Sequence, residues 1–195
     1  MLLQSRLFLF LVLMLPALAM LAPLALGAPW RVPIRPTGEA AAILLVLALA
    51  ISPLKALFAT TAWTRWLVRQ RRAIGLAAAA YSAIHMVVLT LSVGSFADIL
   101  AGMAWASMWT GWAAFAALLV MAAISNDRAL RAMGRSWKAV QRLAYPAAVL
   151  TLGHWLLLTR EWTNALIWLA PLALLQLARL AKSLRARNSN ERTKR

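Results

Sequence analysis

The sequence predicts an all-α integral membrane protein, a bundle of about six transmembrane helices with both chain ends in the cytoplasm. Of its 195 residues, 63% are hydrophobic and only 13% are charged. Soluble domains are about half apolar and about a quarter charged. A water-soluble core of this size cannot absorb so much apolar surface. Lipid is therefore the expected solvent for most of the chain.

Six apolar stretches account for the predicted helices. A helix needs about 20 residues to cross a hydrocarbon core of about 30 Å. Lipid offers no partner for free backbone N–H and C=O groups, so every spanning stretch is expected to be helical. None alternates with the period of two that is typical of membrane barrels. The stretches are residues 7–28, 39–54, 73–93, 108–124, 139–159 and 162–181.

The basic residues predict the orientation. If the N-terminus is inside, 18 of the 21 Lys and Arg residues lie in inner segments, and three (Arg31, Arg35 and Arg160) lie outside. This asymmetry follows the positive-inside rule and indicates that both ends are cytoplasmic. The net charge of +16 therefore indicates topology and contact with anionic lipid, and no nucleic-acid partner is expected.

The two ends of the chain call for separate treatment. Residues 1–35 are expected to form a first transmembrane helix and an outer loop. Residues 1–28 resemble a signal peptide, but the apolar run exceeds the usual length of about 7–15 residues, so we expect a retained helix. The basic segment 182–195 is expected to be a disordered cytoplasmic tail, and residues 36–181 form the remaining membrane domain.

Few side chains can carry chemistry. The absence of cysteine excludes disulfides, thiolate metal sites and iron–sulfur clusters. Ionisable side chains inside a bilayer are costly and mark functional sites, and two histidines qualify, His85 and His154. They lie about 18 Å and about 22 Å above the cytoplasmic ends of parallel helices, at a rise of 1.5 Å per residue. Two imidazoles at similar depth suit axial ligation of a haem iron.

Neighbouring residues fit this hypothesis. Tyr81, Thr151 or a backbone carbonyl is expected to orient the second nitrogen of a ligand ring. Gly153 leaves space beside His154 for a flat macrocycle. Two alternatives stay open: each histidine bonds a neighbouring helix without further function, or both bind a metal, although no carboxylate lies at that depth. The residues placed to meet haem propionates at the outer rim are Arg31, Arg35, Arg160, Trp155 and Trp162.

Four segments together resemble one known family, and one of them is residues 125–130. Residues 36–58 are PTGEAAAILLVLALAISPLKALF, residues 71–89 are RRAIGLAAAAYSAIHMVVL, and residues 134–157 are GRSWKAVQRLAYPAAVLTLGHWLL. Their order and spacing resemble the MsrQ/YedZ family of the ferric-reductase-like transmembrane superfamily, over roughly residues 36–180. The resemblance implies a b-type haem with His85 and His154 as axial ligands of its iron. It also implies a place in the bacterial inner membrane.

One position departs from the family pattern. Gln141 stands where the family usually has another histidine, in Val-Gln-Arg-Leu instead of Leu-His-Arg-Leu. It lies 13 residues before His154, about 20 Å nearer the cytoplasm. Glutamine is a poor haem ligand, so one haem is expected, and a second haem or a flavin at that position stays open.

The resemblance implies an electron-transfer subunit, not a stand-alone enzyme, and no catalytic residue is predicted. Electrons would pass from quinol or a cytoplasmic flavin reductase to a periplasmic molybdenum-containing methionine-sulfoxide reductase. Two alternatives belong to other classes. A cofactor-free transport or assembly protein would need a polar pathway, for which Ser82, Thr90 and Thr151 are too sparse. A ferric or cupric reductase component would need a flavin domain, which another chain would have to supply.

Overall fold

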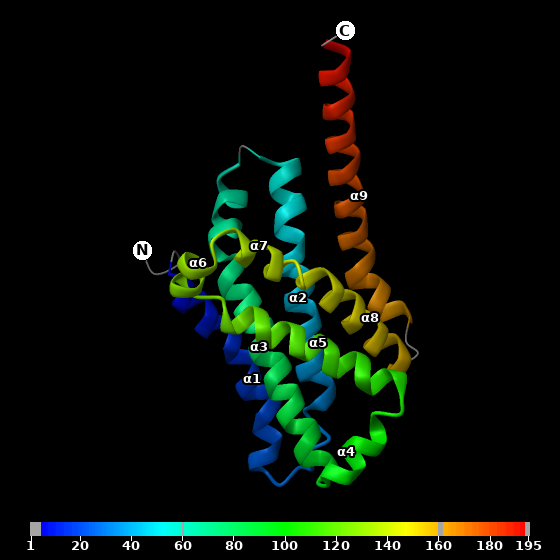
Figure 1. Ribbon diagram of the computed structural model, residues 1–195. Coiled ribbons are helices and arrows are strands. Elements are labelled where there is room, and N and C mark those ends of the chain that lie inside the picture. The colour runs from blue at the N-terminus through cyan, green and yellow to red at the C-terminus, as the bar shows by residue number, and fades with distance from the viewer. Residues whose placement is uncertain (1–4, 60, 160–161, 194–195) are drawn as a thin grey trace.

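The computed structural model describes residues 5–59, 61–159 and 162–193, and this part of the chain is helical without strands (Figure 1). The all-α membrane class is confirmed. The helices are α1 (Arg6–Ala25), α2 (Ile34–Leu57), α3 (Ala62–Val93), α4 (Phe96–Gly102), α5 (Ala106–Ala123), α6 (Asp127–Met133), α7 (Arg135–Gln141), α8 (Ala144–Thr159) and α9 (Trp162–Thr193).

Within the described residues, five helices are long and apolar enough to cross a membrane: α1, α2, α3, α5 and residues Leu166–Ala186 of α9. The predicted stretch 139–159 differs, because it divides between α7 and α8. Helix α8 has 16 residues, or about 24 Å, which is shorter than the hydrocarbon core. The division has a local cause. Pro146 has no N–H to continue a helix from α7, and Tyr145 N–H closes a turn on the Arg142 carbonyl instead (3.0 Å).

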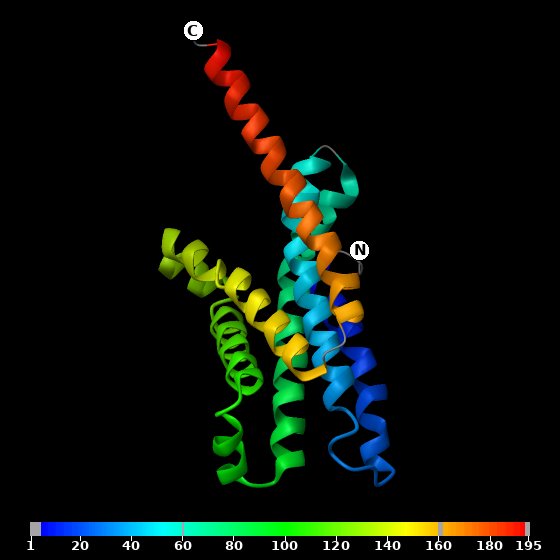
Figure 2. The ribbon, with the colours of Figure 1, turned by 90° about the vertical axis from the view of Figure 1, so that its right-hand side faces the viewer.

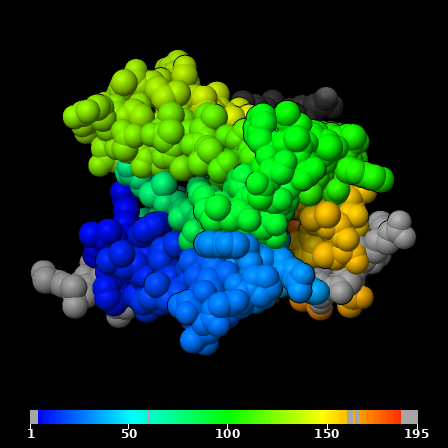
Figure 3. Space-filling view, turned by 90° about the horizontal axis from the view of Figure 1, so that it is seen from below, coloured from blue at the N-terminus to red at the C-terminus, as the bar shows by residue number. Residues whose placement is uncertain are grey.

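The helices run in alternating directions. Figures 1 and 2 show α1, α3 and α8 descending and α2, α5 and α9 ascending, so that the start of α1 and the end of α9 lie toward the same end of the bundle. Two helix pairs dominate the packing, α2 with α3 and α5 with α8. Seen from below, the blue atoms of α1 and of the beginning of α2 lie on one side of the molecule, and the green atoms of the segment around α4 lie on the other (Figure 3).

Small residues allow these helices to approach closely. Ala77 and Ala78 of α3 and Ala147 of α8 are completely buried, which is typical of helix contacts in membranes. The predicted first helix packs into this bundle. Tyr81 of α3, 1% exposed, donates its hydroxyl hydrogen to the Leu13 carbonyl of α1 (3.0 Å). Helix α1 is thereby joined to the core by a buried hydrogen bond.

The segment expected to be a disordered tail is mostly helical. Helix α9 continues through Thr193, and so includes all but the last two residues of 182–195. Leu, Ala, Arg and Lys dominate its last apolar and first basic turns, and all four have high helix propensity. A helix that emerges from the membrane can therefore continue into the basic segment without new tertiary contacts.

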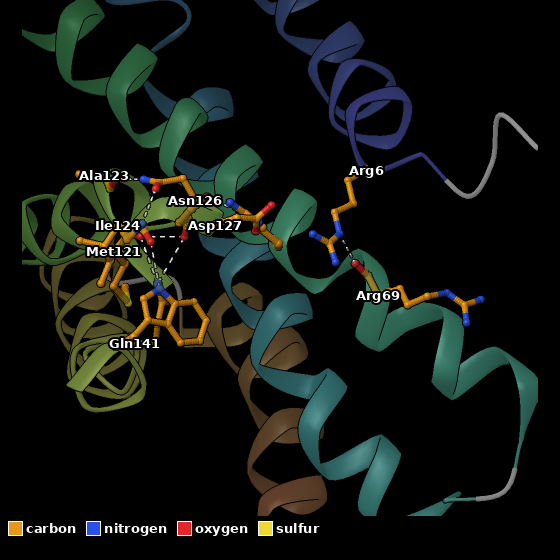
Figure 4. A network of polar contacts seen from close by, with 12 residues as sticks. Arg6, Arg69, Met121, Ala123, Ile124, Asn126, Asp127 and Gln141 are labelled. Carbon is orange, nitrogen blue, oxygen red and sulfur yellow. Dashed lines mark hydrogen bonds and ion pairs between the residues drawn. The ribbon is translucent and has the colours of Figure 1, made fainter. Parts of the chain in front are cut away.

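A polar network joins α3 to the segment after α5. Arg72 donates from Nε to the Ser125 carbonyl (2.6 Å) and from Nη1 to an Asp127 carboxylate oxygen (2.7 Å). The hydrogen bond from Arg72 and its charge lower the pKa of the Asp127 carboxyl below its usual range. Figure 4 shows Asp127 beside Asn126, which caps α6 by accepting the Ala129 N–H (2.7 Å).

This pair predicts a small pH dependence of stability. Because the pKa of Asp127 is lowered on folding, its contribution is fully present above the unfolded pKa of about 3.9 and is lost as pH falls through the folded value. Asp127→Asn is therefore expected to lower the melting temperature in detergent slightly at pH 7, and by less as the pH is lowered toward 2.5. A difference that stayed constant from pH 7 to pH 2.5 would contradict the assigned pair.

Candidate haem site

The structure brings together the two histidines singled out from the sequence. His85 of α3 and His154 of α8 have ring centres 6.3 Å apart, and their ring planes are inclined by 84°. They are 69 positions apart in the chain and reach the same cavity from different helices. The two histidines, which were predicted to lie at similar depth, therefore lie next to each other.

Each imidazole is fixed by a backbone carbonyl of a third or fourth helix. His85 Nδ1 lies 2.8 Å from the Ile34 carbonyl oxygen of α2, and His154 Nδ1 lies 2.5 Å from the Ser107 carbonyl oxygen of α5. A carbonyl oxygen only accepts, so Nδ1 carries the proton in both rings and Nε2 keeps its lone pair. This is the tautomer of a histidine that binds metal through Nε2.

The sequence offered three partners for these nitrogens, and the backbone carbonyl is the one realised. Tyr81 is engaged with the Leu13 carbonyl instead. Thr151 lines the cavity but is not the residue that holds either Nδ1. Sequence alone could not have identified the carbonyls, because every residue has one and only the helix packing selects Ile34 and Ser107.

Glycines pack against both rings, although they are not the predicted one. A methyl group at Gly38 would lie 2.9 Å from Nδ1 and Cε1 of His85, and one at Gly111 would lie 2.7 Å from the same atoms of His154. No atom lies within 4 Å of the equivalent position at Gly153, and Gly153 does not line the cavity. The proposed role of Gly153 is therefore wrong, because it lies on a different face of α8.

The two rings border a cavity of about 220 Å³ between α2, α3, α5 and α8. Its lining is mostly apolar. Arg35 Nε and a Glu39 carboxylate oxygen form an ion pair (2.8 Å). Trp155 Nε1–H is buried and has no hydrogen-bond partner among the described residues. A buried donor without a partner is free to bond a polar atom of a ligand or a water molecule.

The predicted propionate contacts divide accordingly. Arg35 and Trp155 line the cavity, whereas Arg31 does not. Arg160 and the side chain of Trp162 lie outside the described residues. Arg35 and Trp155 are therefore candidates at this cavity, Arg31 is not, and the contacts expected of Arg160 and Trp162 stay predictions.

These features fit a haem. Two imidazoles that bind one metal ion through bonds of about 2 Å have ring centres about 6 Å apart, close to the observed 6.3 Å. Both rings have the tautomer that ligation requires, and an orphaned donor borders the same cavity. Among the described residues, no group of three or more histidines and carboxylates could hold a metal ion by itself. Two axial ligands and an apolar cavity suit an iron that a macrocycle already coordinates.

Gln141 lies in a different, polar cavity of about 580 Å³ toward the other end of the bundle. Its Nε2 donates to the Met121 carbonyl (3.2 Å) and lies 3.3 Å from Ser125 Oγ (Figure 4). The amide thus ties α7 to the end of α5, where Trp137 Nε1 also donates to the Ile124 carbonyl (2.9 Å). Gln141 has a structural role in this chain.

Comparison with known proteins shows the family to which the chain belongs. The model of the ferric-reductase-like transmembrane component matches residues 37–152, a range that includes Gly38, His85 and Gly111. A protein-methionine-sulfoxide reductase heme-binding subunit MsrQ of Rhodospirillum rubrum is 32% identical over 167 residues, covering 80% of this chain and 75% of its own. The chain belongs to the MsrQ/YedZ family. No solved structure matches it.

Other MsrQ relatives are similarly distant. That of Azospira oryzae is 34% identical over 121 residues, or 60% of this chain and 50% of its own. That of Deinococcus radiodurans is 32% identical over 152 residues, or 74% and 71%. Both carry the same description as heme-binding subunits. The name describes what those relatives bind.

Proposed function

We propose that this protein is a membrane electron-transfer subunit that binds one b-type haem through His85 and His154. The observation that carries the proposal is the meeting of two Nδ1-protonated imidazoles at one cavity. The MsrQ relatives, described as heme-binding subunits of a methionine-sulfoxide reductase, support it. Haem supplies one-electron chemistry, because its iron alternates between ferric and ferrous states.

The residues of this chain would bind, orient and bury the cofactor. His85 and His154 would hold the iron between them and would leave no coordination site open for oxygen or substrate, which would favour electron passage over catalysis at the iron. The carbonyls of Ile34 and Ser107 hold the rings in the required tautomer. Trp155 Nε1–H, and Arg35 beside Glu39, are donors on residues that line the cavity and would meet the propionates.

The proposed topology has both termini in the cytoplasm of a bacterium and the haem toward the periplasmic side of the inner membrane. The strong excess of basic residues in the segments at one end of the bundle supports it. Helix α8 would be the sixth crossing, with α7 and the turn at Arg142 lying at the inner surface. The histidines would then lie at the end of the bundle that holds the α1–α2 connection and α4.

The proposed acceptor is a periplasmic molybdenum-containing methionine-sulfoxide reductase, and the proposed donor is quinol or a cytoplasmic flavin reductase. The descriptions of the MsrQ relatives support the class of acceptor. Gln141, engaged with the backbone of α5, supports a single haem, because no histidine is available at that level for a second one.

The experiment uses the full chain in nanodiscs, reduced under anaerobic conditions and mixed with the candidate reductase. With a catalytic amount of the reductase, we expect the ferrous α-band to be lost within seconds when methionine sulfoxide is added, because the sulfoxide is the final two-electron acceptor. The band is expected to persist when the reductase is omitted. Retention of the ferrous spectrum in the complete mixture would contradict the proposed acceptor. A purified chain without haem would contradict the proposed function itself.

A further inference from the structure

The two halves of the site are built alike. In α2, the Ile34 carbonyl accepts the Nδ1–H of His85, and Gly38 packs against the same ring. In α5, the Ser107 carbonyl accepts the Nδ1–H of His154, and Gly111 packs against that ring. In both helices the glycine follows the accepting carbonyl by four positions, one turn of helix. Both segments lie in the first two turns of their helices.

A threonine precedes each glycine and contacts the same carbonyl. Thr37 Oγ1 lies 2.6 Å from the Pro33 carbonyl oxygen and 3.0 Å from that of Ile34. Thr110 Oγ1 lies 2.7 Å from the Ala106 carbonyl oxygen and 3.0 Å from that of Ser107. Both threonines are buried, with exposed fractions of 0% and 7%. Their hydroxyls therefore share each histidine's acceptor in the same way.

We propose that these five-residue segments, 34–38 and 107–111, are two copies of one histidine cradle, in which Gly38, Gly111, Thr37 and Thr110 are positioning residues for the haem ligands. The glycines determine how closely each ring approaches its carbonyl. The threonines determine how much of the carbonyl's acceptor capacity is left for Nδ1–H. This inference rests on the proposed function, since it assigns roles toward the haem that His85 and His154 hold.

The glycines admit no side chain. A ring held on one side by iron cannot move away from a methyl group on the other without tilting the iron–nitrogen bond. Alanine at Gly38 or Gly111 would approach the ring to less than 3.0 Å, well inside normal van der Waals contact. The ligand would have to rotate or leave its carbonyl, and the 84° relation between the two planes would change with it.

The threonines act on the electronic character of the ligands. A carbonyl that accepts from a hydroxyl is a weaker acceptor for Nδ1–H. When the hydroxyl is removed, the hydrogen bond from Nδ1–H to the carbonyl oxygen strengthens, and the imidazole gains anionic character. A more anionic ligand stabilises ferric relative to ferrous iron, because second-shell partners tune ligand basicity. Removing either hydroxyl is therefore expected to lower the midpoint potential.

The glycine test compares Gly38→Ala and Gly111→Ala with Gly75→Ala and Gly153→Ala, two helical glycines with open space at the same position. All four gain helix propensity from alanine, so a difference between the pairs reports contact with the ring. In the cradle pair we expect haem occupancy to fall at least fivefold, or the remaining haem to show a changed low-spin EPR spectrum. Occupancy and spectra that match the control pair would overturn the proposal.

The threonine test does not change side-chain volume, because valine is nearly isosteric with threonine and lacks only its hydroxyl. Thr37→Val and Thr110→Val are compared with Thr90→Val. In the wild type the Thr90 hydroxyl donates to the Met86 carbonyl, which is not the carbonyl that binds His85 or His154. We expect full haem occupancy and a negative shift in midpoint potential, smaller than the about 59 mV that corresponds to a tenfold change for one electron, in the cradle variants only. An unchanged potential in both, or an equal shift in Thr90→Val, would overturn the role of the hydroxyls.

These outcomes distinguish failure of the proposed function from failure of the histidine cradle. A wild-type chain without haem defeats the proposed function. A wild-type chain with haem whose cradle variants behave as their controls defeats the cradle alone. Folding of every variant is checked by its elution as a single species in detergent, and the threonine series provides a readout if an alanine variant does not fold.

Discussion

Replacing either His85 or His154 with alanine is expected to abolish the low-spin haem spectrum. In the proposed site each ring would supply one ligand to the iron, and its Nδ1–H is held by a carbonyl of another helix. Truncation removes the iron bond and leaves that carbonyl without its histidine partner. Visible spectra of purified variants, oxidised and reduced with dithionite, measure the result. We expect less than about a tenth of wild-type haem, because losing a ligand costs at least the 1.4 kcal/mol of a tenfold change in affinity.

Imidazole provides the matched control for these variants. The deleted ring leaves a space at the cavity wall that added imidazole fits, so millimolar imidazole is expected to restore part of the low-spin spectrum. Restoration would show that the variants fold and lack only the ligand. An alanine variant with full haem and an unchanged spectrum, without imidazole, would exclude that histidine as a ligand.

The second large effect is expected from filling the cavity. Ala114 of α5 is 4% exposed and lines the cavity one turn after Gly111. Leucine at this position would occupy space that the macrocycle needs. Overpacking of a buried site costs about 1–3 kcal/mol, which corresponds to about a fivefold to hundredfold loss of haem affinity. Titration of the haem-free variant with hemin measures it.

Ala116→Leu is the matched control. Ala116 lies two positions further along the same helix, is exposed and does not line the cavity, so the same added atoms face lipid. We expect its haem affinity to equal that of the wild type. Equal losses in Ala114→Leu and Ala116→Leu would mean that the change acts on α5 as a whole and not on the cavity.

The membrane class and the histidine pair could be predicted from the sequence for a common physical reason. Lipid demands long apolar helices and penalises ionisable side chains, so composition alone reveals the helices and leaves His85 and His154 conspicuous. Their equal depth followed from the helical rise and the direction of the charges. Both inferences depend on one-dimensional spacing, which a sequence contains.

The surroundings of the histidines could not be predicted in this way. Gly153 adjoins His154 in the chain, yet it faces open space, whereas Gly111 of another helix contacts the ring. Tyr81, one turn before His85, faces α1 instead of the cavity. These contacts depend on helix rotation and pairing, which sequence neighbours do not report. The one available signal was the repeated Thr-Gly pair, at Thr37–Gly38 and Thr110–Gly111.

The length of α8 was the other difference. The hydropathy of the sequence predicted one apolar stretch over residues 139–159, because the residues of the turn around Leu143 are mostly apolar and include no glycine or proline. Pro146 was the local indication of a helix start, since proline is tolerated in a first turn and not in the interior. The resulting short helix α8 still carries His154 to the cavity. His154 comes from the α5–α8 helix pair, whereas His85 comes from the α2–α3 pair.

The central claim, one haem held by two histidines, is tested most directly by the haem-to-chain ratio of the purified wild-type protein, measured together with its ferric EPR spectrum. The account predicts a ratio near one and a single low-spin species. A ratio near two would show that the chain binds a second haem despite Gln141. A ratio near zero after expression with added haem precursor, or a high-spin signal alone, would contradict axial ligation by His85 and His154.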